Sequence, residues 1–282
     1  MNKKNIIIAN WKMNHSFDEA EKWLKTFDKE IAAYKPLKAD NMPDIVLCPP
    51  AILIDHIDGL LMEDKIDELE ETFKDLDNVP EEKLEEFKLE NRDLKLGGQD
   101  CAYEISGAFT GDISAATLRD AGCDFVILGH SERRANHHES NEIIAKKVTI
   151  AVEQELTPIL CVGESQELRQ ANKYLGFIEE QINNSAPKGF EMEELIIAYE
   201  PIWSIGTGII PTTDQISEMA KFITDILKKN KDIKAKNYRI LYGGSTKKSN
   251  AAEILAVENI NGLLIGGASL DADEFFEIVK LA

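Results

Sequence analysis

Residues Phe125-Val-Ile-Leu-Gly-His-Ser-Glu-Arg-Arg134 contain a complete strand–turn–helix unit, and this unit indicates the fold class. Its four apolar residues are typical of a parallel strand that is buried on both faces. Gly129 forms the turn, and Ser131 begins a helix with an acidic residue in its first turn. His130 lies between them, where the positive end of the helix dipole disfavours a protonated imidazole. We therefore predict a neutral, hydrogen-bonding His130, although a purely structural histidine is the alternative for this segment alone.

Short apolar runs of the same kind recur along the chain. The eight runs begin near Asn5, Asp44, Lys95, Phe125, Thr157, Leu195, Tyr238 and Gly262. Helical patterns separate them, for example at 17–34, 139–155 and 213–229. Eight strand–helix units in 282 residues predict a closed (β/α)8 barrel that forms a single domain, residues 1–282. An open doubly wound sheet is the alternative, and the absence of Gly-x-Gly-x-x-Gly after the first run weakens it.

Composition and charge exclude several classes of partner. The net charge of −19 argues against nucleic acid as a partner, whereas a local positive field would still admit an anionic substrate. No apolar run approaches the length of a membrane helix, and the run at 6–8 is too short for a signal peptide. The four cysteines lack Cys-x-x-Cys spacing, which favours reduced core thiols over disulfides or zinc. We expect a cytoplasmic protein without a membrane partner or a metal site.

A second segment, Ala198-Tyr-Glu-Pro-Ile-Trp-Ser-Ile-Gly-Thr-Gly208, places a carboxylate at the end of an apolar run. Pro201 fixes one dihedral angle directly after Glu200, and two glycines follow within eight residues. This pattern predicts a general base at a strand end with a hinged lid attached to it, which would exclude water from the reaction. A strand, a turn and an incidental acid are the alternative for this segment alone.

Polar and glycine residues follow all but one of the predicted strands. They are Asn10, Lys12, Gln99, His130, Gly163, Glu164, Glu200, Gly243, Gly244, Ser245, Gly266 and Gly267. In a barrel these positions lie around one rim, where barrel active sites are built. The glycine pairs after the last two strands are suited to holding a phosphate by backbone N–H groups.

These motifs, taken together, resemble those of the triosephosphate isomerase family. The resemblance is carried by Asn10-Trp-Lys-Met-Asn14, Gly107-Ala-Phe-Thr-Gly111, Leu128-Gly-His-Ser-Glu-Arg-Arg134, Ala198-Tyr-Glu-Pro-Ile-Trp203, Tyr242-Gly-Gly-Ser245 and Gly266-Gly-Ala-Ser269. The motifs occur in family order and span nearly the whole chain. The resemblance implies interconversion of dihydroxyacetone phosphate and D-glyceraldehyde 3-phosphate, the triose phosphate substrates of glycolysis and gluconeogenesis.

The resemblance also implies a role for each of three catalytic residues. Glu200 would remove a proton from the carbon beside the carbonyl, giving an enediolate. His130 would polarise the carbonyl and move protons between the two oxygens. Lys12, with Glu132 as its partner, would stabilise the developing negative charge.

The same resemblance implies roles for further residues in substrate binding and in assembly. Asn10 would help to position Lys12 and the substrate oxygens. Backbone N–H groups at Gly206, Ser245, Gly266 and Gly267 would hold the phosphate. No metal or organic cofactor would be needed. Members of the family are usually homodimers, in which the loop around Thr110 would reach the neighbouring subunit near Lys12 while Glu139 supports the interface. A different phosphate-binding barrel enzyme and a non-catalytic barrel scaffold are the alternatives.

Three features depart from the family pattern. Residues 63–93 carry fourteen acidic and five basic residues, and their two apolar stripes predict an acidic helical hairpin inserted between the second and third strands. The lid ends in Gly208-Ile-Ile-Pro211, whose proline would stiffen its hinge. Asp100 occupies a position that is commonly Asn, and it would shift pKa values on the rim near the predicted dimer interface.

Overall fold

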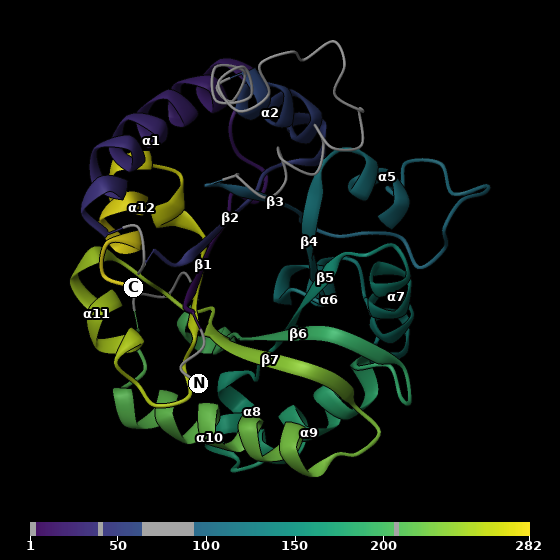
Figure 1. The fold of residues 1–282 in the computed structure, drawn as a ribbon. Helices are drawn as coiled ribbons and strands as arrows, with labels where there is room; N and C mark the ends of the chain where they lie inside the picture. Colours follow the sequence, from purple (N-terminus) through teal and green to yellow (C-terminus); the bar gives the residue numbers. More distant parts are fainter. Residues whose placement is uncertain (1–3, 39–41, 64–92, 206–208) are drawn as a thin grey trace.

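Eight parallel strands close into one barrel in the computed structural model, which describes residues 4–38, 42–63, 93–205 and 209–282 (Figure 1). The strands are β1 (Ile6–Asn10), β2 (Asp44–Cys48), β3 (Lys95–Gly98), β4 (Cys123–Leu128), β5 (Thr157–Val162), β6 (Glu191–Tyr199), β7 (Lys234–Tyr242) and β8 (Gly262–Ile265). Each strand pairs with its neighbour in chain order, and β8 returns to pair with β1. The predicted (β/α)8 barrel is therefore confirmed, and the open sheet is excluded.

Helices form a ring outside the barrel (Figure 1). They are α1 (Phe17–Lys38), α2 (Ala51–Glu63), α5 (Ala115–Asp120), α6 (Ser131–Asn136), α7 (Asn141–Glu153), α8 (Gln166–Gln170), α9 (Tyr174–Ser185), α10 (Thr213–Lys229), α11 (Lys248–Leu255) and α12 (Ala272–Val279), with short 3-10 helices η3 (Ile202–Ser204) and η4 (Gly267–Ser269). α10 matches its predicted bounds because Thr212 and Gln215 form a capping box at its start. None of the helices in the described ranges combines the length and hydropathy that a membrane span needs.

Two apolar layers explain why the strand sequences do not alternate. On β1, Ile6 and Ile8 belong to a cluster inside the barrel, whereas Ile7 and Ala9 pack in the layer between the barrel and the helices. Both faces of β1 are thus buried, as parallel strands between helices require. All four cysteines are free and buried, two of them inside the barrel, which matches the prediction of core thiols.

β6 and β7 begin earlier than the apolar runs indicate. They start at Glu191 and Lys234, four residues before the predicted starts at Leu195 and Tyr238. Glu191 pairs in register with Lys234, and an ion pair joins Glu193 to Lys236 nearby. Cross-strand pairing of opposite charges stabilises this exposed extension, so a search for apolar runs missed it. Figure 1 shows the two strands lying side by side.

The predicted acidic hairpin at 63–93 lies outside the described residues, apart from its first and last positions. It therefore stays a prediction, and so does the description of residues 1–282 as one domain with an insertion. The described ends of this segment are the last residue of α2 and a residue two positions before β3.

Candidate active site

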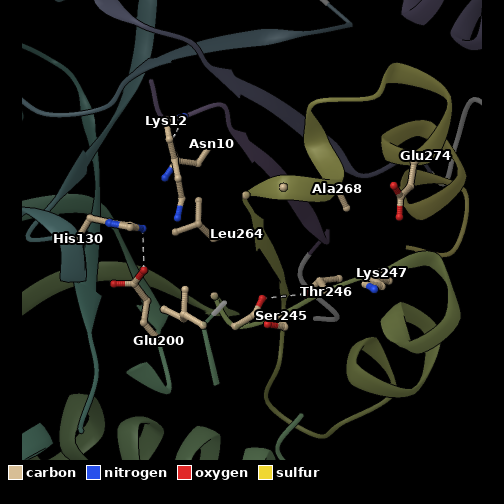
Figure 2. Close-up of a pocket in the computed structure, with 15 residues that line it drawn as sticks. Asn10, Lys12, His130, Glu200, Ser245, Thr246, Lys247, Leu264, Ala268 and Glu274 are labelled. Carbon is tan, nitrogen blue, oxygen red and sulfur yellow. Dashed lines mark hydrogen bonds and ion pairs between the residues drawn. The ribbon is translucent and has the colours of Figure 1, made fainter. Parts of the chain in front are cut away.

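A cavity of about 430 Å³ lies at the carboxyl ends of the strands (Figure 2). Seven of the predicted catalytic and binding residues line this cavity, although they lie far apart in the sequence. They are Asn10, Lys12, His130, Glu200, Ser245, Gly266 and Gly267. The eighth, Gly206, lies outside the described residues. The closed barrel brings these residues together because the carboxyl ends of all its strands meet at one rim.

Glu200 follows β6 and is 1% exposed. Its carboxylate Oε2 accepts a hydrogen bond of 2.9 Å from the backbone N–H of Ser131, and its Oε1 lies 2.9 Å from Nε2 of His130. Gly163 of the neighbouring loop allows the backbone to approach, since a Cβ there would lie 1.8 Å from the carbonyl oxygen of Glu200. A buried carboxylate in contact with an imidazole is suited to general acid–base chemistry.

His130 caps the N-terminus of α6 with its ring. Nδ1 accepts a hydrogen bond of 3.2 Å from the backbone N–H of Glu132. This contact requires Nδ1 to be unprotonated, so the ring proton lies on Nε2, beside Glu200. The tautomer that the helix N-terminus selects therefore directs a donor toward the carboxylate that lines the cavity.

The pKa of His130 does not follow the prediction made from the helix alone. Burial lowers this pKa, but the nearby Glu200 carboxylate raises it by more than burial lowers it. The pKa of His130 is therefore above its ordinary value. The sequence-based expectation of a depressed pKa was wrong for this arrangement because it omitted the charge of Glu200. The hydrogen bond at Nδ1 still favours the singly protonated ring, so it opposes the effect of the Glu200 charge.

Lys12 is held in position by its backbone as well as its side chain. Its φ of 54° is unusual for a residue other than glycine. The backbone N–H of Lys12 donates to Oδ1 of Asn10 at 3.1 Å, and its carbonyl accepts from Nε2 of Gln99 at 2.8 Å. Its Nζ lies 2.6 Å from Oε1 of Glu132, the partner that the resemblance implied. Asn10 and Gln99 thus impose a strained backbone that directs the ammonium group across the rim.

Gly244 after β7 and Gly266 after β8 lie close to different neighbouring side chains. A Cβ at Gly244 would lie 2.2 Å from Oη of Tyr242, and one at Gly266 would lie 3.2 Å from Cε of Lys12. The hydroxyl of Ser245 donates to the carbonyl of Ser204 at 2.9 Å, which ties the loop after β7 to η3. Gly267 begins η4, so the first N–H groups of that helix lack partners within it.

Glu164 supports the segment that precedes the predicted lid. This fully buried carboxylate accepts hydrogen bonds from Tyr199 at 3.0 Å, Trp203 at 2.9 Å and Arg169 at 2.9 Å. Sequence reasoning placed Glu164 on the rim but did not find this function. The tryptophan in the Pro-Ile-Trp motif was the available signal, because a buried indole N–H requires an acceptor.

Three polar residues of the cavity were not predicted. Thr246 and Lys247 follow the Gly243-Gly244-Ser245 motif directly, so adjacency could have identified them. Glu274 lies in the first turn of α12 and reaches the cavity only because that helix follows η4. Nothing in the linear sequence relates Glu274 to the strand ends.

A second cavity, of about 380 Å³, lies beside the first and contains a network of charged groups. Nζ of Lys147 lies 2.8 Å from both carboxylate oxygens of Asp100 and 2.7 Å from Oε1 of Glu139. Arg133 Nε lies 2.9 Å from Asp100 and 2.6 Å from Glu139. Burial raises the pKa of Asp100 to about 6, although Lys147 opposes the shift. Glu139, for which the cations outweigh burial, has a lowered pKa.

Comparison with known proteins gives one family. The family model for triosephosphate isomerase matches residues 5–79 and 78–282. The triosephosphate isomerases of Amoebophilus asiaticus and Hyphomonas neptunium are 40% and 39% identical to the chain, and at least 98% of each sequence is covered. The crystal structure of triosephosphate isomerase from Bartonella henselae superposes with a TM-score of 0.78 at 34% identity, covering 99% of both chains. The chain therefore belongs to the triosephosphate isomerase family.

Proposed function

We propose that the rim cavity is the active site of an isomerase that interconverts dihydroxyacetone phosphate and D-glyceraldehyde 3-phosphate. Family membership over the whole chain supports the reaction. The contact between Glu200 and His130, in a cavity that Lys12 also lines, supports the assignment of roles. A non-catalytic scaffold would have no requirement for this set of groups.

Glu200 is the general base that removes the proton from the substrate. Its carboxylate takes a proton from the carbon beside the substrate carbonyl and returns it to the neighbouring carbon. The Nε2–H of His130 donates to the carbonyl oxygen as negative charge develops there. A substrate oxygen that accepts this proton replaces Oε1 of Glu200, which frees the carboxylate for the reacting carbon. Removing the carboxylate from the ring also removes the main cause that raises the pKa of His130.

Lys12 supplies the fixed positive charge. Its ammonium group stabilises the enediolate oxygens, and Asn10 and Gln99 hold its backbone so that it requires little reorganisation during the reaction. Glu132 lies in the first turn of α6, where its carboxylate contacts Lys12 and its backbone N–H donates to His130, which couples the positions of Lys12 and His130. Arrangement of these groups before the substrate binds lowers the barrier more than their separate charges would.

The substrate phosphate lies against the loops after β7 and β8. Backbone N–H groups of Ser245, Gly266 and Gly267 donate to its oxygens, and the glycines permit close approach. The resemblance adds a fourth N–H group, that of Gly206, which lies outside the described residues. The reaction involves no metal or organic cofactor, because the substrate carbonyl itself acidifies the adjacent carbon.

The active form is a homodimer in the cytoplasm. The loop between β3 and α5, which contains Thr110, extends away from the barrel (Figure 1). Large apolar side chains are exposed after β1, at the start of α2 and in the loop between β3 and α5: Met13, Ile52, Ile105, Phe109 and Ile113. Exposed apolar side chains in these segments favour a protein interface. A second copy would bring its Thr110 loop close to Lys12, and Glu139 would support the interface.

A coupled assay on the purified protein tests the reaction. Wild-type protein should convert either triose phosphate to the other, and in heavy water it should incorporate deuterium at the carbon from which Glu200 takes the proton. Glu200→Gln should lose both turnover and exchange while retaining the fold. Wild-type protein that binds triose phosphate without exchange would contradict the proposal.

A further inference from the structure

Lys247 is a charged residue that lines the active-site cavity but has no role in the proposed catalytic mechanism. It precedes α11 directly and lines the cavity beside Thr246 (Figure 2). Its backbone N–H donates to Oδ1 of Asn250 at 2.8 Å, which fixes where the side chain leaves the loop. The side chain is exposed, and the described residues provide no carboxylate within ion-pair distance of it.

The two lysines of the cavity differ in how their charge is compensated. Lys12 lies 2.6 Å from Glu132, so part of its charge is compensated before an anion arrives. Lys247 retains its full charge toward the cavity. Because the chain carries a net charge of −19, the long-range field opposes an anionic substrate. A cation that lines the cavity and has no carboxylate within ion-pair distance among the described residues can oppose that field locally.

Glu274 carries a negative charge, which repels the anions that Lys247 attracts. It lies in the first turn of α12 and lines the same cavity, on the side of Lys247 and away from His130 and Glu200 (Figure 2). An acidic residue in a first turn stabilises its own helix, which is reason enough for its presence there. Its charge nevertheless repels any anion that binds beside η4.

We propose that Lys247 binds the substrate phosphate electrostatically and that Glu274 weakens that binding, so the pair sets the affinity for the dianion. The proposal deepens the proposed function, because it adds a residue to the phosphate side of the same site. The chemistry of isomerisation takes place at the other side of the cavity. Both residues therefore act on KM and on anion binding, with little effect on kcat.

The neighbouring lysine provides a matched control for Lys247. Lys248 is exposed and adjacent, but its ammonium pairs with Glu277 and it does not line the cavity. Asp273 is the corresponding control for Glu274, because it lies in the same turn of α12 and does not line the active-site cavity. Within each pair the two variants change the net charge of the protein equally at different places, and the Lys248 variant also removes the exposed ion pair with Glu277.

Steady-state kinetics at two salt concentrations tests the lysine. Lys247→Gln should raise KM about five- to tenfold at about 0.01 M salt, and the increase should largely disappear at about 1 M, where the screening length is about 3 Å. Lys247→Arg should restore the wild-type KM, and Lys248→Gln should leave it unchanged. Equal effects of the Lys247 and Lys248 variants, or a fall in kcat with unchanged KM, would overturn the proposal.

The acidic residue gives a test of opposite sign. Glu274→Gln should lower KM about two- to fivefold at low salt, whereas Asp273→Asn should not. Calorimetric binding of inorganic phosphate should change in parallel, and it requires no turnover. Failure of the proposed isomerase activity would therefore remain distinguishable, since phosphate affinity would still report on Lys247 and Glu274. Phosphate affinity that is unaffected by either substitution would refute the proposal whatever the activity.

Discussion

The two rim cavities contain similar residues and use their charges differently. In the active-site cavity, Glu200 and His130 contact each other through one pair of atoms, and Lys12 has one acidic partner. In the neighbouring cavity, Lys147 and Arg133 each contact both Asp100 and Glu139, so the four groups form a closed network. A substrate can replace a single contact, whereas replacing a closed network would leave several buried charges unpaired.

α6 connects the two cavities. His130 caps this helix and lines the active site, while Arg133 on the same helix belongs to the charged network. Glu132, between them in sequence, contacts Lys12. A rigid network on one side of a short helix therefore fixes the position of the catalytic groups on the other side.

The largest effect is expected at the reacting carboxylate. Glu200→Asp retains the charge and withdraws it by one methylene, and a displacement of about 1 Å can reduce turnover roughly 10²-fold. KM should change far less, because Glu200 does not bind the phosphate. Steady-state assays of both reaction directions measure the effect. Near-normal turnover in the aspartate variant would show that Glu200 is not the base.

Assembly should depend on the loop that contains Thr110. Thr110→Glu would carry a larger, charged side chain into the predicted interface near Lys12, where burying the charge costs free energy, so we expect dissociation at micromolar concentration. Sedimentation should give twice the 31.6 kDa chain mass for wild type and the single-chain mass for the variant. Thr110→Ser, which keeps the hydroxyl, is the control and should remain dimeric. A wild-type monomer with full activity would contradict the predicted interface.

The charge of Glu200 should be measurable at His130. Glu200→Gln removes the nearby carboxylate and leaves burial and the N-terminus of α6, which both disfavour the protonated ring. The pKa of His130 should therefore be lower in the variant than in wild type. NMR titration of the ring gives both values. A pKa that is the same in wild type and variant would mean that the two side chains do not interact in solution.

Asp100 should make stability depend on pH. Its folded-state pKa of about 6 exceeds the ordinary value of 3.8, so the folded state binds the proton more tightly than the unfolded state. Stability therefore falls as pH rises from about 4 through about 6, and above this window the cost is complete. With the side chain 18% exposed, we expect a cost of about 1–3 kcal/mol.

Asp100→Asn removes this titration, so the variant should be more stable than wild type near neutral pH and should show a flatter profile between pH values of about 4 and 6. Asp112→Asn, at an exposed position on the same cavity, is the control. Denaturant unfolding measures the free energy of unfolding of both variants. The protein concentration is kept constant because dimerisation would otherwise shift the denaturation midpoint. An asparagine variant with the wild-type pH profile would assign the dependence to another group.

Much of this arrangement was predictable because it depends on local sequence. Buried parallel strands require apolar runs, and the polar residues that follow Ile8, Leu128 and Tyr199 could be assigned to one rim once eight runs were counted. The upward direction of the His130 pKa was not predictable, because it depends on the 2.9 Å contact with a residue seventy positions away. Glu274 was missed for the same reason, since only tertiary structure places it in the cavity.

The smallest effect is expected from the acidic segment. Replacing residues 64–92 with a short Gly/Ser linker removes no residue that lines the described active-site cavity, and α2 ends on the outside of the barrel. Because the cost of closing a loop grows slowly with length, the barrel should tolerate the change, and turnover should stay within about threefold of wild type. Steady-state kinetics beside a thermal melt and a sedimentation run makes the measurement. Since both cavities should be intact in the variant, a folded dimer whose turnover has fallen a hundredfold would show that the segment acts on the active site, and the separation between rim chemistry and the rest of the molecule would not hold.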